Sequence, residues 1–272
     1  MRESEKESIL NVFLEIATES DHLVDKWRSG NKQILTKINI NGVSDVVTEL
    51  DLQIEENAKK ILHKSYPRIN FVGEETFKGD YSVFNGDYFI MDPIDGTRPF
   101  INGSDEWSIS LCVVSETEPM SGLLYLPDKK IMLTAIKGQG TKFNGSILSL
   151  GKDSNQEQYL GISPHQTLIH QKYMEKSLLK PVSISALTPK ITAILREQVS
   201  AAIYYPEEGK SALLWDYAAA NLLIREAGGV MKSLTGDIMP YNTNKIIHKD
   251  GWIAAKNNSL FEEIKNRVNI KL

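Results

Sequence analysis

The segment that most constrains the fold is YFIMDPIDGT, residues 88–97, where an apolar run passes directly into a turn with two aspartates. The run at residues 88–91 predicts a buried strand. Asp92 and Asp95 follow it with a proline between them and a glycine after, which makes a stiff turn. We therefore expect this strand to end at a cleft and to aim both carboxylates into it.

Two further acidic positions fit the same cleft. Glu74-Glu75 follows a short apolar strand at residues 71–72, and Asp216 opens a strongly helical segment. Like charges about 4 Å apart repel by about 4 kcal/mol at an effective dielectric near 20, so such a cluster requires a cation or protonation. An all-oxygen ligand set indicates Mg²⁺, with Mn²⁺ as the alternative ion, and not zinc.

Each acidic motif also has an ordinary structural explanation. Asp-Pro and Asp-Gly are common turn dipeptides, and Glu74-Glu75 could be a solvated loop. The helix dipole favours an aspartate such as Asp216 in a first turn without any function. Only the conjunction of the three motifs favours a metal site.

The remaining pattern indicates an α/β protein with a large core. The chain has 272 residues and is 41% hydrophobic, enough for one bilobed unit or two tightly packed domains. Residues 1–150 are predicted to form an α+β half and residues 151–272 an α/β half. Helices are expected at residues 1–30, 48–66, 168–179, 188–196 and 213–227 and near the C-terminus, and strands at residues 71–72, 88–91, 109–114, 122–125, 131–135, 159–162 and 201–205 and near Val230 and Ile253.

Composition argues against several classes of protein. The net charge of −4 provides no basic field for nucleic-acid phosphates. Cys112 is the only cysteine, so it cannot form an internal disulfide, and a reducing compartment is expected. The charged N-terminus lacks the apolar core of a signal peptide, and no window reaches about 18 consecutive apolar residues. We expect a soluble cytoplasmic protein without membrane or nucleic-acid partners.

Over nearly its whole length the chain resembles the lithium-sensitive, magnesium-dependent phosphatases typified by inositol monophosphatase. The resemblance rests on Gly73-Glu74-Glu75, on residues 92–97, and on Trp215-Asp216 leading to residues 226–229, with a weaker match at residues 47–51. It implies a layered αβαβα sandwich of the sugar-phosphatase type. It also implies a homodimer.

The resemblance assigns roles to single residues. Glu74, Asp92 and the carbonyl of Ile94 would bind one Mg²⁺ ion, and Asp92, Asp95 and Asp216 a second. Glu74 would also hold a weaker third ion. Asp51 and Thr97 would orient and deprotonate the attacking water. The alternative for Asp51 is a helix-capping role alone, and the alternative for Thr97 is the cap of a short helix.

Substrate binding is less clearly specified. The amides of Gly96 and Thr97, with Asp95, Asp216 and Arg98, are the expected substrate contacts. Arg98 could grip a second phosphate or be a solvated surface residue. His165 is interpreted as a surface loop residue outside the site.

The predicted partner is a small phosphorylated metabolite. Inositol monophosphate and 3'-phosphoadenosine 5'-phosphate, a substrate of the related bisphosphate nucleotidases, are the leading candidates, with histidinol phosphate as an alternative. A non-catalytic regulatory binding protein on the same fold is the alternative of a different class. The complete acidic set favours an enzyme.

Overall fold

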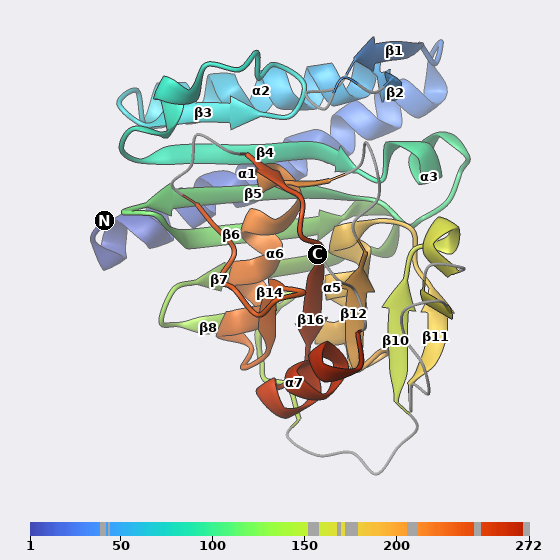
Figure 1. The fold of residues 1–272 in the computed structure, drawn as a ribbon. Helices are drawn as coiled ribbons and strands as arrows, with labels where there is room; N and C mark the ends of the chain where they lie inside the picture. Colours follow the sequence, from blue (N-terminus) through green and yellow to red (C-terminus); the bar gives the residue numbers. More distant parts are fainter. Residues whose placement is uncertain are drawn as a thin grey trace.

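The computed structural model describes residues 1–38, 42, 44–151, 158–167, 170–171, 179–205, 211–241 and 246–268. Helices and sheets alternate in five layers, and the long helix α1 lies behind the larger sheet while α6 lies in front of it (Figure 1). Three clusters of buried apolar side chains fill the spaces between the layers. The predicted αβαβα architecture is confirmed.

The first layer consists of two amphipathic helices, α1 (Glu3–Ser29) and α2 (Glu49–Ser65). Ile9, Phe13 and Ile16 follow helical spacing on α1 and are fully buried against the sheet. The cap of α2 was predicted: the Thr48 side chain accepts from the Asp51 amide, and the Asp51 carboxylate accepts from the Thr48 amide. This cap fixes where α2 begins.

The second layer is a seven-stranded sheet in the order β3-β4-β5-β6-β7-β8-β9. Its strands are β3 (Asn70–Gly73), β4 (Tyr88–Asp95), β5 (Ser108–Ser115), β6 (Glu118–Leu126), β7 (Ile131–Ile136), β8 (Gly140–Phe143) and β9 (Ser146–Leu148). Only the β3–β4 pair is parallel among these neighbours. Because β3 and β4 run in parallel, their carboxyl ends, which carry Glu74 and Asp92, lie at the same end of the sheet.

Strand β4 is buried on both faces, which explains its continuous apolar sequence. Tyr88 and Ile90 belong to the core beside α6, whereas Phe89 and Met91 belong to the core beside α1 and α2. A helical layer therefore covers each side of the strand that ends in the aspartate turn.

The third layer consists of α5 (Leu187–Leu195) and α6 (Leu214–Glu226), which separate the two sheets. Helix α6 approaches β6 closely at Gly122, where an added Cβ would lie 3.3 Å from the Cα of Ala219. Small residues on both elements allow this approach. The packing fixes the position of α6 and hence of Asp216 in its first turn.

The fourth and fifth layers are a second sheet and a terminal helix. The sheet has the order β11-β10-β12-β16-β14, and α7 (Asn258–Arg267) packs against it. Its strands are β10 (Tyr159–Ile162), β11 (Lys180–Ser183), β12 (Ala201–Tyr204), β14 (Val230–Ser233) and β16 (Trp252–Ala255). Strand β11 was not predicted, and the predicted helix at residues 168–179 lies largely outside the described residues.

Shorter elements complete the fold. A hairpin of β1 (Ile34–Ile38) and β2 (Ser44–Thr48), which the sequence analysis did not anticipate, leads into α2. Helix α3 (Thr97–Ile101) begins directly after Gly96. A second short pair, β13 (Ala212–Leu213) and β15 (Ile247–His248), precedes and follows α6 along the chain. Single-turn 3₁₀ helices occur at Tyr81–Phe84, Pro127–Lys129 and Pro164–Gln166.

The change from one sheet to the other falls near residue 150, between β9 and β10. One core cluster nevertheless contains side chains from both sides of that point, including Leu124 and Leu222. The division into two halves remains a prediction. Within the described part of the chain, no helix has the length and apolar character needed to span a membrane.

Substituting Gly122 tests the close packing of α6. Gly122→Leu should lower the free energy of unfolding by about 1–3 kcal/mol, because the larger side chain must push α6 away from β6. Gly122→Ala, whose Cβ needs a shift of only a few tenths of an ångström, should cost less. Urea unfolding followed by circular dichroism measures both, and equal stability of the Leu variant and the parent would contradict the packing argument.

Candidate metal centre

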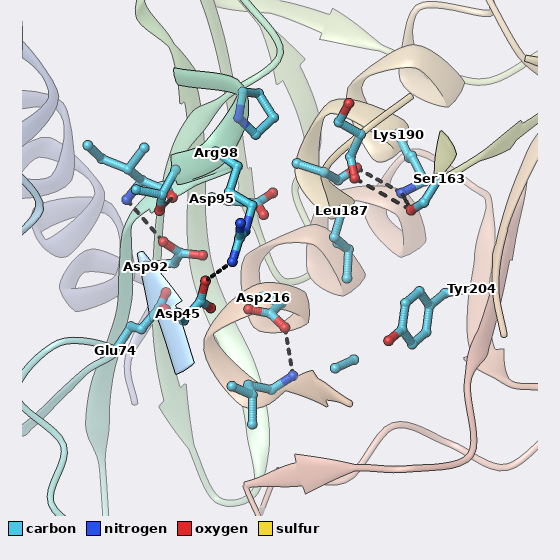
Figure 2. A pocket seen from close by; sticks show the side chains of 18 of the residues that line it. Asp45, Glu74, Asp92, Asp95, Arg98, Ser163, Leu187, Lys190, Tyr204 and Asp216 are labelled. Atoms are coloured by element: carbon cyan, nitrogen blue, oxygen red, sulfur yellow. Dashed lines mark hydrogen bonds and ion pairs between the residues drawn. The ribbon is translucent and has the colours of Figure 1, made fainter. Parts of the chain in front are cut away.

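Three carboxylates converge at one end of the larger sheet. Glu74 follows β3, Asp92 lies near the end of β4, and Asp216 lies in the first turn of α6 (Figure 2). One oxygen from each lies within 4.8 Å of the others, close enough for all three to bind one ion. Segments far apart in the sequence thus bring together three of the predicted metal ligands.

Local backbone contacts position these three residues. The amide of Glu74 donates to the carbonyl of Met91 (3.1 Å), which continues the β3–β4 ladder past its last paired residues. The Asp92 Oδ1 accepts from the Ile94 amide (3.0 Å), and the ladder between β4 and β5 shifts register there. The Asp216 Oδ2 accepts from the Leu213 amide (2.6 Å) at the start of α6. These contacts therefore orient the carboxylates of Asp92 and Asp216 and fix the backbone position of Glu74.

The electrostatics of the cluster require positive charge. Burial, together with the charge of Glu74, raises the pKa of Asp92 well above its usual range, and the same causes raise the pKa of Asp216. Desolvated carboxylates so close together repel one another strongly when ionised. A divalent cation with oxygen ligands removes this penalty, so the donor set fits Mg²⁺ or Mn²⁺.

Asp95 points to a different partner. Its Oδ2 accepts hydrogen bonds from the Thr188 amide (2.7 Å) and hydroxyl (2.5 Å) at the start of α5. Burial raises the pKa of Asp95, and the Thr188 hydrogen bonds oppose that rise. Asp95 lines the same pocket as the three converging carboxylates but does not belong to their group.

Asp51 and Thr97 are brought together as expected. The Thr97 hydroxyl donates to Asp51 Oδ1 (3.3 Å), and also to the Ile94 carbonyl (3.1 Å). The other oxygen of Asp51 caps α2 through Thr48, so Asp51 makes both the capping contact and the contact with Thr97. Burial raises the pKa of Asp51 to about 6, against the Thr48 hydrogen bonds that lower it.

A lysine from the β1–β2 hairpin completes the acidic end. Lys37 Nζ lies 2.9 Å from Glu74 Oε1 and 2.6 Å from both carboxylate oxygens of Glu75. Burial, with the charge of Glu74, raises the pKa of Glu75 to about 8. Burial lowers the pKa of Lys37, but Glu74 and Glu75 raise it by more, so the net shift is upward and Lys37 stays charged. Nothing in the sequence pattern indicated this residue.

The pocket extends from the carboxylates toward the smaller sheet and has a volume of about 430 Å³. Gly96 lies in its wall, where a Cβ would be 2.7 Å from the Glu106 carbonyl, so this close approach at φ +96° requires glycine. Arg98 is 65% exposed at the rim and lies 3.5 Å from Asp45. His165, placed outside the site by the sequence analysis, is exposed but also lines the pocket.

A buried lysine occupies the wall opposite the carboxylates (Figure 2). Lys190 Nζ donates to the Ser163 hydroxyl (2.8 Å) and to the Ala186 carbonyl (3.2 Å). Burial lowers the pKa of Lys190 to about 8, although the charges of Asp95 and Glu106 act against this. Its sequence neighbourhood is an ordinary helical stripe, so only the fold reveals that it faces the site.

Comparison with known proteins identifies relatives of this chain. A sequence model described as the inositol monophosphatase family matches residues 5–270. "Inositol monophosphatase 2" of Saccharomyces cerevisiae is 30% identical over 239 residues, covering 83% of this chain and 82% of the relative. "Nus factor SuhB" of Haemophilus influenzae is 26% identical over 275 residues, covering 96% and 95%.

Solved structures agree on the fold. One is the crystal structure of an "IMPase/NADP phosphatase complexed with Mg2+ and phosphate". It has a TM-score of 0.82 to this chain, 20% sequence identity, and coverage of 98% of this chain and 97% of the other. At this identity the likeness establishes the architecture alone.

Replacing Asp92 tests the charge repulsion. The raised pKa means that the protonated form contributes stability below the ordinary value of 3.8, and that this contribution is lost as pH rises through the folded-state value. In the presence of a chelator, the melting temperature of the parent should therefore fall as pH rises above the ordinary carboxyl range. The melting temperature of Asp92→Asn should fall less over the same change in pH. At pH 8 it should lie roughly 2–4 °C above that of the parent, which corresponds to a gain of about 1 kcal/mol in the free energy of unfolding.

Magnesium supplies the control for this measurement. Added Mg²⁺ should raise the melting temperature of the parent at pH 8 and leave that of Asp92→Asn nearly unchanged, because the variant lacks a ligand charge. Equal stabilisation of both proteins by Mg²⁺ would remove Asp92 from the metal site.

Proposed function

The chain belongs to the inositol monophosphatase family, and we propose that it is a magnesium-dependent phosphomonoesterase acting on a small phosphorylated metabolite. The observation that carries the proposal is the group of three carboxylates, Glu74, Asp92 and Asp216, at the end of a pocket of about 430 Å³. A pocket of this size suits a metabolite.

In the proposed mechanism the acidic residues would hold two to three Mg²⁺ ions. Glu74, Asp92 and Asp216 would be ligands, together with Asp95 and the carbonyl of Ile94. When bound, magnesium supplies Lewis-acid chemistry that lowers the pKa of water and stabilises negative charge on the leaving oxygen. Asp92 is buried and the other three carboxylates are half-buried, which strengthens the charge interactions at the site.

Asp51 and Thr97 would act on the nucleophile. The Thr97 hydroxyl, held between Asp51 and the Ile94 carbonyl, can orient an attacking water and relay its proton to the Asp51 carboxylate. With a pKa of about 6, Asp51 is ionised at neutral pH and can accept that proton. The second Asp51 oxygen is anchored by Thr48, which holds the carboxylate in place.

The start of α3 would receive the phosphate. Gly96 permits a close approach of the backbone, and the amides of Gly96 and Thr97 would donate to phosphate oxygens. Asp95, Asp216 and Arg98 would contact the rest of the substrate.

Two features favour different substrates. The relatives named inositol monophosphatase support an inositol monophosphate. Arg98 and Lys190 line the pocket and add positive charge, which supports a substrate with a second anionic group, such as 3'-phosphoadenosine 5'-phosphate. Histidinol phosphate is the third candidate.

A regulatory binding role is the alternative of a different class. It is supported by the relative named Nus factor, which matches 96% of this chain. The complete set of acidic side chains favours catalysis, because a binding protein has no need to hold three carboxylates within 4.8 Å of one another. Cytoplasmic location and homodimer formation accompany the proposal; the lone buried Cys112 supports a reducing location.

Substrate release assays test the reaction class. Phosphate release from inositol 1-phosphate, 3'-phosphoadenosine 5'-phosphate and histidinol phosphate should require Mg²⁺, favour one substrate and be inhibited by lithium. Asp216→Asn should lower kcat/KM by about a thousandfold, since Lewis-acid stabilisation contributes several kcal/mol. Asp250→Asn, at an exposed position outside the pocket, is the control. No release from any ester would favour the regulatory alternative.

Arg98→Ala tests the second anionic group. If Arg98 grips a second phosphate, the variant should lower kcat/KM for the bisphosphate by about tenfold and change that for the monophosphate little. Arg68→Ala, an exposed arginine outside the pocket, should affect neither substrate. Equal losses on both substrates would remove Arg98 from substrate selection.

A further inference from the structure

A buried carboxylate that is not among the predicted ligands supports the turn that carries Glu74. Glu55, on α2, is fully buried. Its Oε2 accepts from the Glu75 amide (2.8 Å) and its Oε1 from the Thr76 amide (2.9 Å). Both oxygens of one carboxylate thus hold the two residues that directly follow Glu74.

We propose that Glu55 is a positioning residue that orders the Glu74 turn before any metal binds. The proposal rests on the metal-binding role proposed for Glu74. Two backbone hydrogen bonds also hold this turn. The Phe77 amide donates to the Gly73 carbonyl within the turn (3.0 Å), and the Glu74 amide donates to the Met91 carbonyl of β4 (3.1 Å). Glu55 supplies the remaining anchors from a separate helix.

Gly73 shows how closely the carboxylate approaches the turn. A Cβ at this position would lie 2.1 Å from Glu55 Cδ and within 2.5 Å of both carboxylate oxygens. No φ-angle requirement is involved, because the residue lies in β3 with extended backbone. Glycine precedes Glu74 because the Glu55 carboxylate occupies the space that a side chain would need.

Burying Glu55 is costly in free energy, which argues for a specific purpose. Burial raises its pKa, and hydrogen bonds from Thr76 and Glu75 oppose the rise. Across the described ranges no Lys, Arg or His forms an ion pair with it. An apolar side chain would pack α2 against the sheet without this penalty. The carboxylate is explained by the two amides that it orders.

The placement on α2 links the turn to the proposed catalytic acid. Glu55 lies four residues after Asp51, on the same face of the helix, and both side chains are fully buried. One rigid element therefore fixes Asp51 relative to the Glu74 turn. Lys37, on the β1–β2 hairpin, contacts the same turn through ion pairs with Glu74 and Glu75. A ligand held in this way loses little conformational freedom when it binds an ion.

The first test compares Glu55→Gln with Glu56→Gln. Glutamine keeps the shape of the Glu55 side chain but has only one carbonyl oxygen. Its NH₂ group must therefore face the backbone N–H of either Glu75 or Thr76, and one of the two hydrogen bonds is lost. Glu56 is the matched control, since it is the neighbouring residue of the same helix, is exposed to solvent, and forms a surface ion pair with Lys60. Titration calorimetry with Mg²⁺ should show affinity about tenfold weaker for Glu55→Gln. The affinity of Glu56→Gln should match the parent.

Two kinetic readouts separate positioning from general destabilisation. For Glu55→Gln, the Mg²⁺ concentration for half-maximal rate should rise about tenfold, whereas KM for substrate at saturating Mg²⁺ stays near the parental value. A purely structural role would reduce the folded fraction and leave the Mg²⁺ affinity of the folded protein unchanged. A folded Glu55→Gln protein with affinity within twofold of the parent would overturn the proposal.

The second test uses the unaltered chain and does not depend on whether a variant folds. Hydrogen exchange of the metal-free protein, followed by NMR, should show the amides of Glu75 and Thr76 already protected, with little further protection on adding Mg²⁺. Rapid exchange that slows only with Mg²⁺ would overturn the proposal. Neither calorimetry nor exchange uses a substrate, so failure of the proposed phosphatase activity would leave both readouts interpretable.

Discussion

The repulsion among desolvated carboxylates is the constraint on which the rest of the structure depends. Glu74, Asp92 and Asp216 bring their oxygens within 4.8 Å of one another, and Asp95 lines the same pocket. Such an arrangement is unfavourable without a cation, because burial and like charge both disfavour the ionised forms. The fold holds it together through rigid element ends: two parallel strands, a helix start and a bulged turn. The clustered carboxylates destabilise this part of the fold, and the same clustering provides a binding site for positive charge.

Both sheets and the helices between them line this site. Asp216 belongs to the helical layer between the sheets, and Thr188 in the same layer binds the carboxylate of Asp95. The pocket therefore lies where the larger sheet, the middle helices and the smaller sheet meet, and Lys190 and Arg98 add basic groups to its walls. Family membership and geometry agree on a phosphatase scaffold. The proposed substrate preference depends on these walls and not on the carboxylates.

Much of the fold was predictable because its signals are local. Periodicity identified α1 and α2, the Thr48–Asp51 pair marked a helix cap, and continuous apolar runs marked strands such as β4. Strands β1 and β11 were missed because they are short and mostly exposed, and β2 because its burial rises along the strand; none of the three shows the alternation typical of a half-buried strand. The predicted ligands were found from turn chemistry and family resemblance. Lys37, Glu55 and Thr188 were missed because each contacts the site through residues distant in sequence.

The sequence by itself determined which carboxylates stand at element ends, since strand runs, glycines, prolines and caps are encoded within a few residues. It also determined the glycine before Glu74. Only the tertiary structure decided why that glycine is needed, because the Glu55 carboxylate that fills its space comes from another helix. Likewise, only the fold places Asp95 against Thr188 and outside the group of three converging acids. Local chemistry specifies the groups, whereas long-range packing specifies their distances, and charge interactions depend on distance.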